Sequence, residues 1–98
     1  MNAVLIEVNV AGVERDTSLE GLRDRLVPAI SSMPGFASGT WLTGNNDGRG
    51  LSLTVWNSEE QAQAFAGKFG IGTNPQAGAA VERCEIREVA ATAECPRA

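Results

Sequence analysis

The sequence predicts an α+β fold, in which two helices cover one face of a four-stranded antiparallel sheet. Apolar residues alternate along four short segments and recur every three or four positions along two longer ones. The segments follow the order strand, helix, strand, strand, helix, strand. With right-handed crossovers, this order gives the ferredoxin-like βαββαβ plait. We expect one domain over residues 1–90, followed by a flexible C-terminal tail over residues 91–98.

The first strand is expected at residues 3–10, where side chains alternate between the two faces of the sheet. One face is wholly apolar and consists of Val4, Ile6, Val8 and Val10. The other face is mixed and carries Leu5, Glu7 and Asn9. Polar side chains on a central strand need hydrogen-bond partners or solvent. Glu7 and Asn9 are therefore candidates for a site.

The first helix is expected to begin at Thr17, because Thr17 and Glu20 fit a capping box. Its apolar stripe consists of Leu19, Leu22, Leu26, Ile30 and Met33. Pro28 interrupts the helix, since it has no N–H and its ring clashes with the carbonyl of Asp24. A kink is predicted there, and Pro34-Gly35 ends the helix.

The second and third strands are expected at residues 38–43 and 51–56, with a hairpin loop from Gly44 to Gly50. On the third strand, one face carries Leu51, Leu53 and Val55, and the other carries Ser52, Thr54 and Trp56. Ser58 and Gln61 then fit a second capping box. The helix that follows has an apolar stripe of Ala62, Phe65, Ala66 and Phe69, and the last strand is expected at residues 79–89.

Composition argues against several classes of function. The net charge is -4, from 12 acids and 8 bases, whereas nucleic acids and anionic membranes require a basic patch. We therefore expect no nucleic-acid partner and no membrane association. No signal peptide or membrane span is visible, which predicts a cytoplasmic protein. Cys84 and Cys95 lack CxxC spacing and are expected to be free thiols, with a disulfide or a nucleophilic role as alternatives.

Three motifs resemble the dimeric α/β-barrel proteins, in particular the antibiotic-biosynthesis-monooxygenase-like family. They are Pro34-Gly35-Phe36, Thr54-Val55-Trp56 and Ser58-Glu59-Glu60. The resemblance implies a homodimer with facing sheets, and a ligand cavity between the sheet and the helices of each subunit. It also implies a small cofactor-independent monooxygenase acting on an aromatic or polyketide-like molecule. The alternative is a non-catalytic ligand-binding or regulatory protein of the same fold.

The haem-degrading branch of these proteins differs from the chain at its working positions. Its cavity tryptophan falls on Phe65, its haem-ligating histidine falls near Pro75, and its first-strand asparagine falls on Leu5. The chain has no histidine to ligate iron. The resemblance therefore leads us to expect no haem partner.

A cofactor-free oxygenase needs a base that deprotonates its substrate, and a dry aromatic cavity. Glu7 is the candidate catalytic base, and Asn9 is the candidate polar group that orients the ligand. The expected pocket walls are Trp41, Trp56, Phe65 and Phe69. A structural role in the core is the alternative for these aromatic residues. For Glu7 the alternative is a solvated sheet end, or an ion pair with Arg83 or Arg87.

Apolar side chains on both faces of the sheet also predict a homodimer. Two helices cover only one face, so an apolar area remains on the other, and large exposed apolar patches are uncommon on monomers. Val8 distinguishes the two faces. We expect Val8→Asp to weaken dimerisation if Val8 lies between sheets, and to unfold the subunit if Val8 faces the helices.

Overall fold

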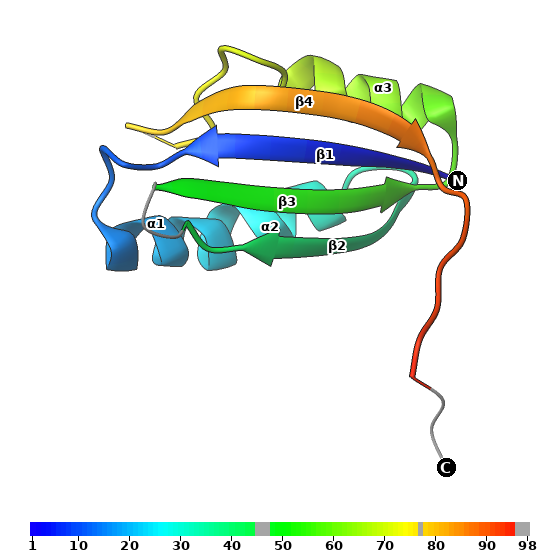
Figure 1. The fold of residues 1–98 in the computed structure, drawn as a ribbon, viewed down its shortest axis with the longest axis horizontal. Helices are drawn as coiled ribbons and strands as arrows, with labels where there is room; N and C mark the ends of the chain where they lie inside the picture. The colour runs from blue at the N-terminus through cyan, green and yellow to red at the C-terminus, as the bar shows by residue number, and fades with distance from the viewer. Residues whose placement is uncertain (45–47, 77, 96–98) are drawn as a thin grey trace.

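The computed structural model describes residues 1–44, 48–76 and 78–95 and confirms the predicted ferredoxin-like fold (Figure 1). Its elements, in chain order, are β1 (Asn2–Asn9), α1 (Arg15–Gly21), a π-helical segment η1 (Leu22–Leu26), α2 (Val27–Ser31), β2 (Phe36–Leu42), β3 (Arg49–Trp56), α3 (Glu59–Lys68) and β4 (Ala80–Glu88). Of the predicted hairpin loop, residues 45–47 lie outside the described residues, as do residues 96–98 of the predicted tail.

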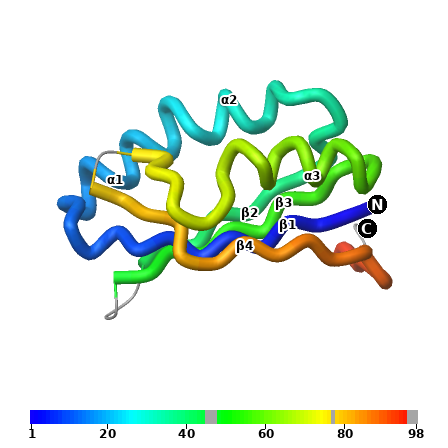
Figure 2. The backbone as a smooth tube through the Cα atoms, turned by 90° about the horizontal axis from the view of Figure 1, so that it is seen from above, coloured from blue at the N-terminus to red at the C-terminus, as the bar shows by residue number. Residues whose placement is uncertain are grey.

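The four strands form one antiparallel sheet in the order β2-β3-β1-β4. The view from above shows the helices together on one side of this sheet, with the other side uncovered (Figure 2). The pairing of β1 with β4 shifts between Glu7 and Val8, which gives β4 an irregularity near its start. β1 and β3 are the two central strands of the sheet.

The first helix begins at Arg15, two residues before the predicted start. Glu14 is the N-cap, and its carboxylate accepts hydrogen bonds from the backbone N–H groups of Asp16 and Thr17 at 3.0 and 2.9 Å. The Thr17 hydroxyl donates to the same carboxylate at 2.8 Å. These bonds stabilise the charged form of Glu14 and lower its pKa. The capping box predicted at Thr17 and Glu20 was wrong, because the Glu14 carboxylate already accepts hydrogen bonds from the free backbone N–H groups at the start of the helix.

The predicted irregularity at Pro28 is a π-helical segment that lies one turn before the proline. Residues Leu22–Leu26 form a π-helical segment, in which the N–H of Val27 donates to the carbonyl of Leu22, five residues back. Pro28 has no N–H to donate to Asp24 and its ring needs room beside that carbonyl. The wider π turn provides this room, and α2 continues beyond it to Ser31.

The helix-covered face of the sheet holds the core. The fully or nearly fully buried side chains are Val4, Ile6, Ile30, Trp56, Ala62, Phe65 and Val81. Val8 lies on the same face as Val4 and Ile6 and packs against this cluster. Of the two outcomes considered for Val8→Asp, we therefore expect loss of subunit stability.

β1 begins and β4 ends at the same end of the sheet (Figure 1). The N–H of Val89, just after β4, donates to the carbonyl of Met1 at 2.9 Å. Residues 89–95 form no helix or strand, and Cys84 is a free thiol. Within the described ranges, no helix has the length and apolar character required to cross a lipid bilayer.

Candidate functional site

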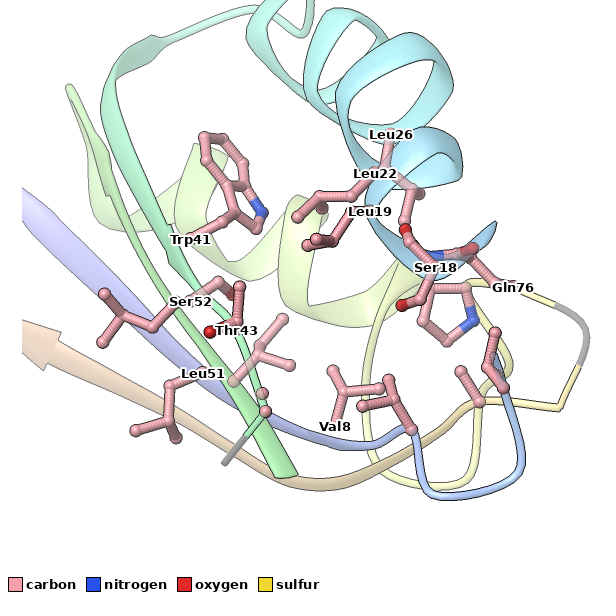
Figure 3. A pocket seen from close by; sticks show the side chains of 18 of the residues that line it. Val8, Ser18, Leu19, Leu22, Leu26, Trp41, Thr43, Leu51, Ser52 and Gln76 are labelled. Atoms are coloured by element: carbon pink, nitrogen blue, oxygen red, sulfur yellow. The ribbon is translucent and has the colours of Figure 1, made fainter. Parts of the chain in front are cut away.

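A cavity of about 300 Å³ lies between the helices and the sheet, where β1 ends and β3 and β4 begin (Figure 3). The helical side contributes the apolar side chains Leu19, Leu22, Leu26 and Ile30. The sheet and α3 contribute Ile6, Val8, Trp41, Phe65 and Phe69. Its size and its apolar, aromatic walls are typical of a small-molecule site.

The cavity exists because the covered face of β3 carries progressively smaller side chains. Read from the end of the strand back to its start, alternate positions hold Trp56, Thr54, Ser52 and Gly50. Trp56 and Thr54 are completely buried under the helices. A side chain at Gly50 would have only the backbone atoms Leu42 O and Gly44 N within 4 Å among described atoms. The core is therefore solid at one end of the sheet and hollow at the other.

Trp41 forms one wall of the cavity, and its position depends on Gly39. A Cβ atom at Gly39 would lie only 2.6 Å from the indole ring of Trp41, so the missing side chain makes room for the ring. Trp41 also stacks beside Phe36, with ring centroids 6.5 Å apart. Register places Trp41 opposite Ser52 on β3, on the same face of the sheet.

A continuous row of aromatic rings connects the solid core to the cavity. The Trp56 and Phe65 rings are 4.8 Å apart, and the Phe65 and Phe69 rings are 5.1 Å apart. Phe65 and Phe69 line the cavity, whereas Trp56 does not. Trp56 is completely buried, and its indole N–H donates to Thr54 Oγ1 at 2.9 Å. Of the four aromatic residues predicted as pocket walls, Trp41, Phe65 and Phe69 line the cavity, whereas Trp56 lies in the packed core.

The polar residues that line the cavity are Arg15, Ser18, Thr43, Ser52 and Gln76. Gln76 connects two sides of the cavity, since its Nε2 donates to the carbonyl of Ser18 at 3.2 Å. None of the described lining residues is Asp, Glu, His or Cys. The described walls therefore provide no side chain that acts as a general base at neutral pH.

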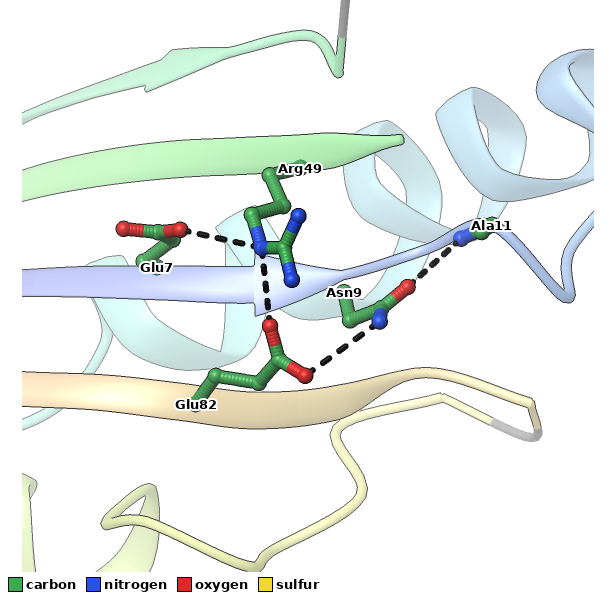
Figure 4. Close-up of polar contacts among 5 residues, drawn as sticks. All are labelled: Glu7, Asn9, Ala11, Arg49 and Glu82. Carbon is green, nitrogen blue, oxygen red and sulfur yellow. Dashed lines mark hydrogen bonds and ion pairs between the residues drawn. The ribbon is translucent and has the colours of Figure 1, made fainter. Parts of the chain in front are cut away.

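Glu7 and Asn9 do not line this cavity, because both belong to the uncovered face of the sheet (Figure 4). Arg49 Nε lies 3.2 Å from Glu7 Oε1 and 2.9 Å from Glu82 Oε1. Asn9 Nδ2 donates to Glu82 at 3.2 Å, and Asn9 Oδ1 accepts from the N–H of Ala11 at 3.0 Å. Glu7 thus pairs with Arg49, rather than with Arg83 or Arg87 as considered from the sequence.

Glu82 joins this polar group from β4 and bonds to both Asn9 and Arg49. The hydrogen bond from Asn9, and then that from Arg49, stabilise its carboxylate and lower its pKa. The group is exposed, with side chains of Glu82 and Arg49 about two-fifths accessible. An exposed network of this kind orders the sheet surface but resembles no enclosed reaction site.

A solved structure that resembles this chain shares its architecture over almost the whole length. The heme-degrading protein Rv3592 from Mycobacterium tuberculosis superposes with a TM-score of 0.61 and 24% sequence identity, over 97% of this chain and 98% of that chain. This likeness establishes the shared ferredoxin-like fold and supports the antibiotic-biosynthesis-monooxygenase-like resemblance at that level. No protein-family model matches the sequence, and no curated protein matches it.

The expectation that haem is not a partner must be corrected. It relied on departures at single positions, whereas the fold match covers nearly all of a chain named for heme degradation. The apolar and aromatic walls of the cavity suit the body of a porphyrin, and haem therefore belongs among the candidate ligands. The described lining residues include no His, Cys, Met or Tyr, the side chains that ligate haem iron. We therefore derive no chemical step through iron.

Proposed function

We propose that the chain is a small monooxygenase-type protein whose cavity binds a flat, largely apolar molecule. The observation that carries the proposal is the cavity of about 300 Å³ with Trp41, Phe65 and Phe69 in its walls. Aromatic rings provide large, rigid apolar surfaces for a planar ligand. The motifs that resemble the antibiotic-biosynthesis-monooxygenase-like family support oxygen-dependent chemistry as the class of reaction, on a fold shared with a heme-degrading protein.

Cofactor-free oxygenation in this cavity would place specific demands on the substrate. The substrate would have to donate the electrons to dioxygen itself, and to enter already ionised, because the described walls contain no carboxylate or imidazole. Electron-rich aromatic and polyketide-like hydroquinones meet both demands at mildly alkaline pH. The alternative, a non-catalytic ligand-binding protein, needs only the cavity.

Tryptophan fluorescence tests whether the cavity binds ligands. The Trp56→Phe variant leaves Trp41 as the only tryptophan, and the Trp41→Phe variant leaves only the buried Trp56. Each is titrated with 1,4-naphthohydroquinone, 9-fluorenone and haemin under anaerobic conditions. We expect saturable quenching in the variant that retains Trp41 and much less quenching in the other. Equal responses of both variants, or none, would refute the proposed site.

Oxygen consumption then distinguishes the two functions. Each ligand that binds is mixed with the protein in an oxygen electrode cell with catalase, and its products are analysed by mass spectrometry. Incorporation of one oxygen atom above the protein-free rate supports the monooxygenase-type reaction. Saturable binding with no rate above that background supports the ligand-binding alternative.

We also propose that the uncovered face of the sheet pairs with a second copy of the chain. This face exposes Leu42, Leu51 and Leu53, with exposed fractions of 56%, 37% and 47%. Exposed apolar areas of this kind mark interaction surfaces. Analytical ultracentrifugation at low micromolar concentration tests the pairing: we expect a dimer that Leu53→Asp converts to a folded monomer. A wild-type species near 10.3 kDa would contradict it.

A further inference from the structure

We propose that the Trp41 indole N–H and the Ser52 hydroxyl form the polar recognition point of the cavity, where they bind an oxygen atom on the edge of a flat ligand. This inference rests on the proposed ligand site and specifies what that site selects. It predicts that a carbonyl or phenolic oxygen distinguishes the ligands of this chain from plain hydrocarbons.

Ser52 is a polar side chain in an unusually enclosed place. It is only 7% exposed and stands on the helix-covered face between the apolar Ile6 on β1 and Trp41 on β2. Among the described residues, no group hydrogen-bonds to its side chain. No fully enclosed side-chain N or O atom of the described residues lacks a hydrogen-bond partner, so the unpaired Ser52 hydroxyl opens into the cavity. A ligand group that enters the cavity can therefore hydrogen-bond to it.

Trp41 supplies a donor beside this hydroxyl. Figure 3 shows its indole nitrogen turned toward the interior of the cavity, on the side of Leu19 and Leu22. Within the described part of the chain, nothing accepts a hydrogen bond from this N–H. The indole N–H only donates, whereas a hydroxyl both donates and accepts.

The chemistry of the pair defines the matching ligand group. Trp41 and Ser52 are register partners that both line the cavity and both can donate. Two neighbouring donors favour an acceptor, and a carbonyl or phenolic oxygen has lone pairs for both. Trp56 at the solid end makes the contrast clear, since its N–H is already bonded to Thr54 Oγ1. On the covered face of β3, the Thr54 hydroxyl is thus already paired with a tryptophan, whereas among the described residues the Ser52 hydroxyl is not.

A matched pair of ligands tests the inference. Fluorene and 9-fluorenone share their shape and differ in one carbonyl oxygen, and neither reacts readily with thiols. Affinities are measured by equilibrium dialysis for the wild type, Ser52→Ala and Trp41→Phe. We expect the wild type to prefer 9-fluorenone, and each variant to weaken 9-fluorenone binding about three- to tenfold, as for loss of one hydrogen bond. Fluorene binding should weaken less than 9-fluorenone binding in each variant, because the carbonyl oxygen is absent from fluorene.

The possible failures are distinguishable. If neither ligand binds the wild type, the cavity is not a ligand site, and the proposed function fails together with this inference. If both ligands bind equally and the variants weaken neither selectively, the cavity is a ligand site but the polar pair does not recognise oxygen. Retained fluorene binding in each variant shows that the cavity itself has folded.

Discussion

The two ends of the layer between helices and sheet are built from the same elements but packed differently. At one end, Trp56 and Thr54 are completely buried and bonded to each other. At the other end, a second tryptophan and a second hydroxyl residue, Trp41 and Ser52, lie opposite each other on the covered face and line a cavity. The fold therefore needs close packing in only part of the layer between helices and sheet. The remainder is free to hold a ligand, at a cost in packing.

The largest expected effect lies at the solid end. Trp56→Ala removes a fully buried indole, and we expect a loss of about 3–5 kcal/mol in the free energy of unfolding. Trp41→Ala, at the hollow end, should cost clearly less, since part of the Trp41 surface already faces the cavity. Urea unfolding of the two variants measures the difference. Equal losses would show that the two ends are packed alike.

Leucine substitutions at two covered positions of β3, residues 54 and 52, compare the solid end of the core with the hollow end directly. Thr54→Leu overpacks the solid end and removes the acceptor of the Trp56 N–H, so we expect a loss of about 1–3 kcal/mol. Ser52→Leu projects into the cavity, so its loss should stay below about 1 kcal/mol. Ser52→Leu should nevertheless abolish ligand binding. Thermal unfolding and fluorescence titration measure the two effects, and an unfolded Ser52→Leu protein would contradict the assignment.

A smaller change in stability is expected from Gly39→Ala. The new methyl group would lie 2.6 Å from the Trp41 ring, which must rotate away because the strand backbone is fixed. We expect a loss of about 1 kcal/mol, together with a shift of Trp41 emission and weaker ligand binding. Gly67→Ala is the matched control, since a side chain there meets no atom within 4 Å. Unchanged Trp41 emission in Gly39→Ala would show that the ring does not depend on Gly39.

The smallest expected effect concerns the uncovered face and depends on pH. The pKa of Glu82 is lowered in the folded chain, so its carboxylate stabilises the fold above the unfolded pKa of about 4.3. This contribution is lost as the pH falls through the folded pKa. Glu82→Gln should therefore be less stable than the wild type at pH 7, and the difference should shrink toward pH 3. A constant difference in chemical-denaturation series would contradict the linkage.

The fold could be predicted from the sequence because its signals are local and agree with one another. Alternating apolar residues placed β1 and β3, and the Ser58 cap placed the start of α3. The start of α1 could not be predicted correctly. A glutamate at the N-cap is a weaker signal than Thr17 with Glu20, and only its bonds to Asp16 and Thr17 reveal its role.

The site was harder to predict because the sequence leaves open which face of the sheet the helices cover. Glu7 seemed suited to a cavity because it is polar on a central strand, yet the uncovered face provides Arg49 as its partner. The useful signal was the decreasing size of alternate residues from Trp56 to Gly50. That pattern is visible in the sequence, but it predicts a cavity only once the covered face is known.

The bond between Met1 and Val89 has a practical consequence for how the molecule is handled. The start of the chain and the end of β4 meet at this bond, whereas the cavity lies where β3 and β4 begin, at the opposite end of the strands. A biotin or affinity tag at either terminus would therefore anchor the protein to a sensor surface with the cavity directed away from the support. Attachment through one terminus or the other should give the same ligand-binding kinetics.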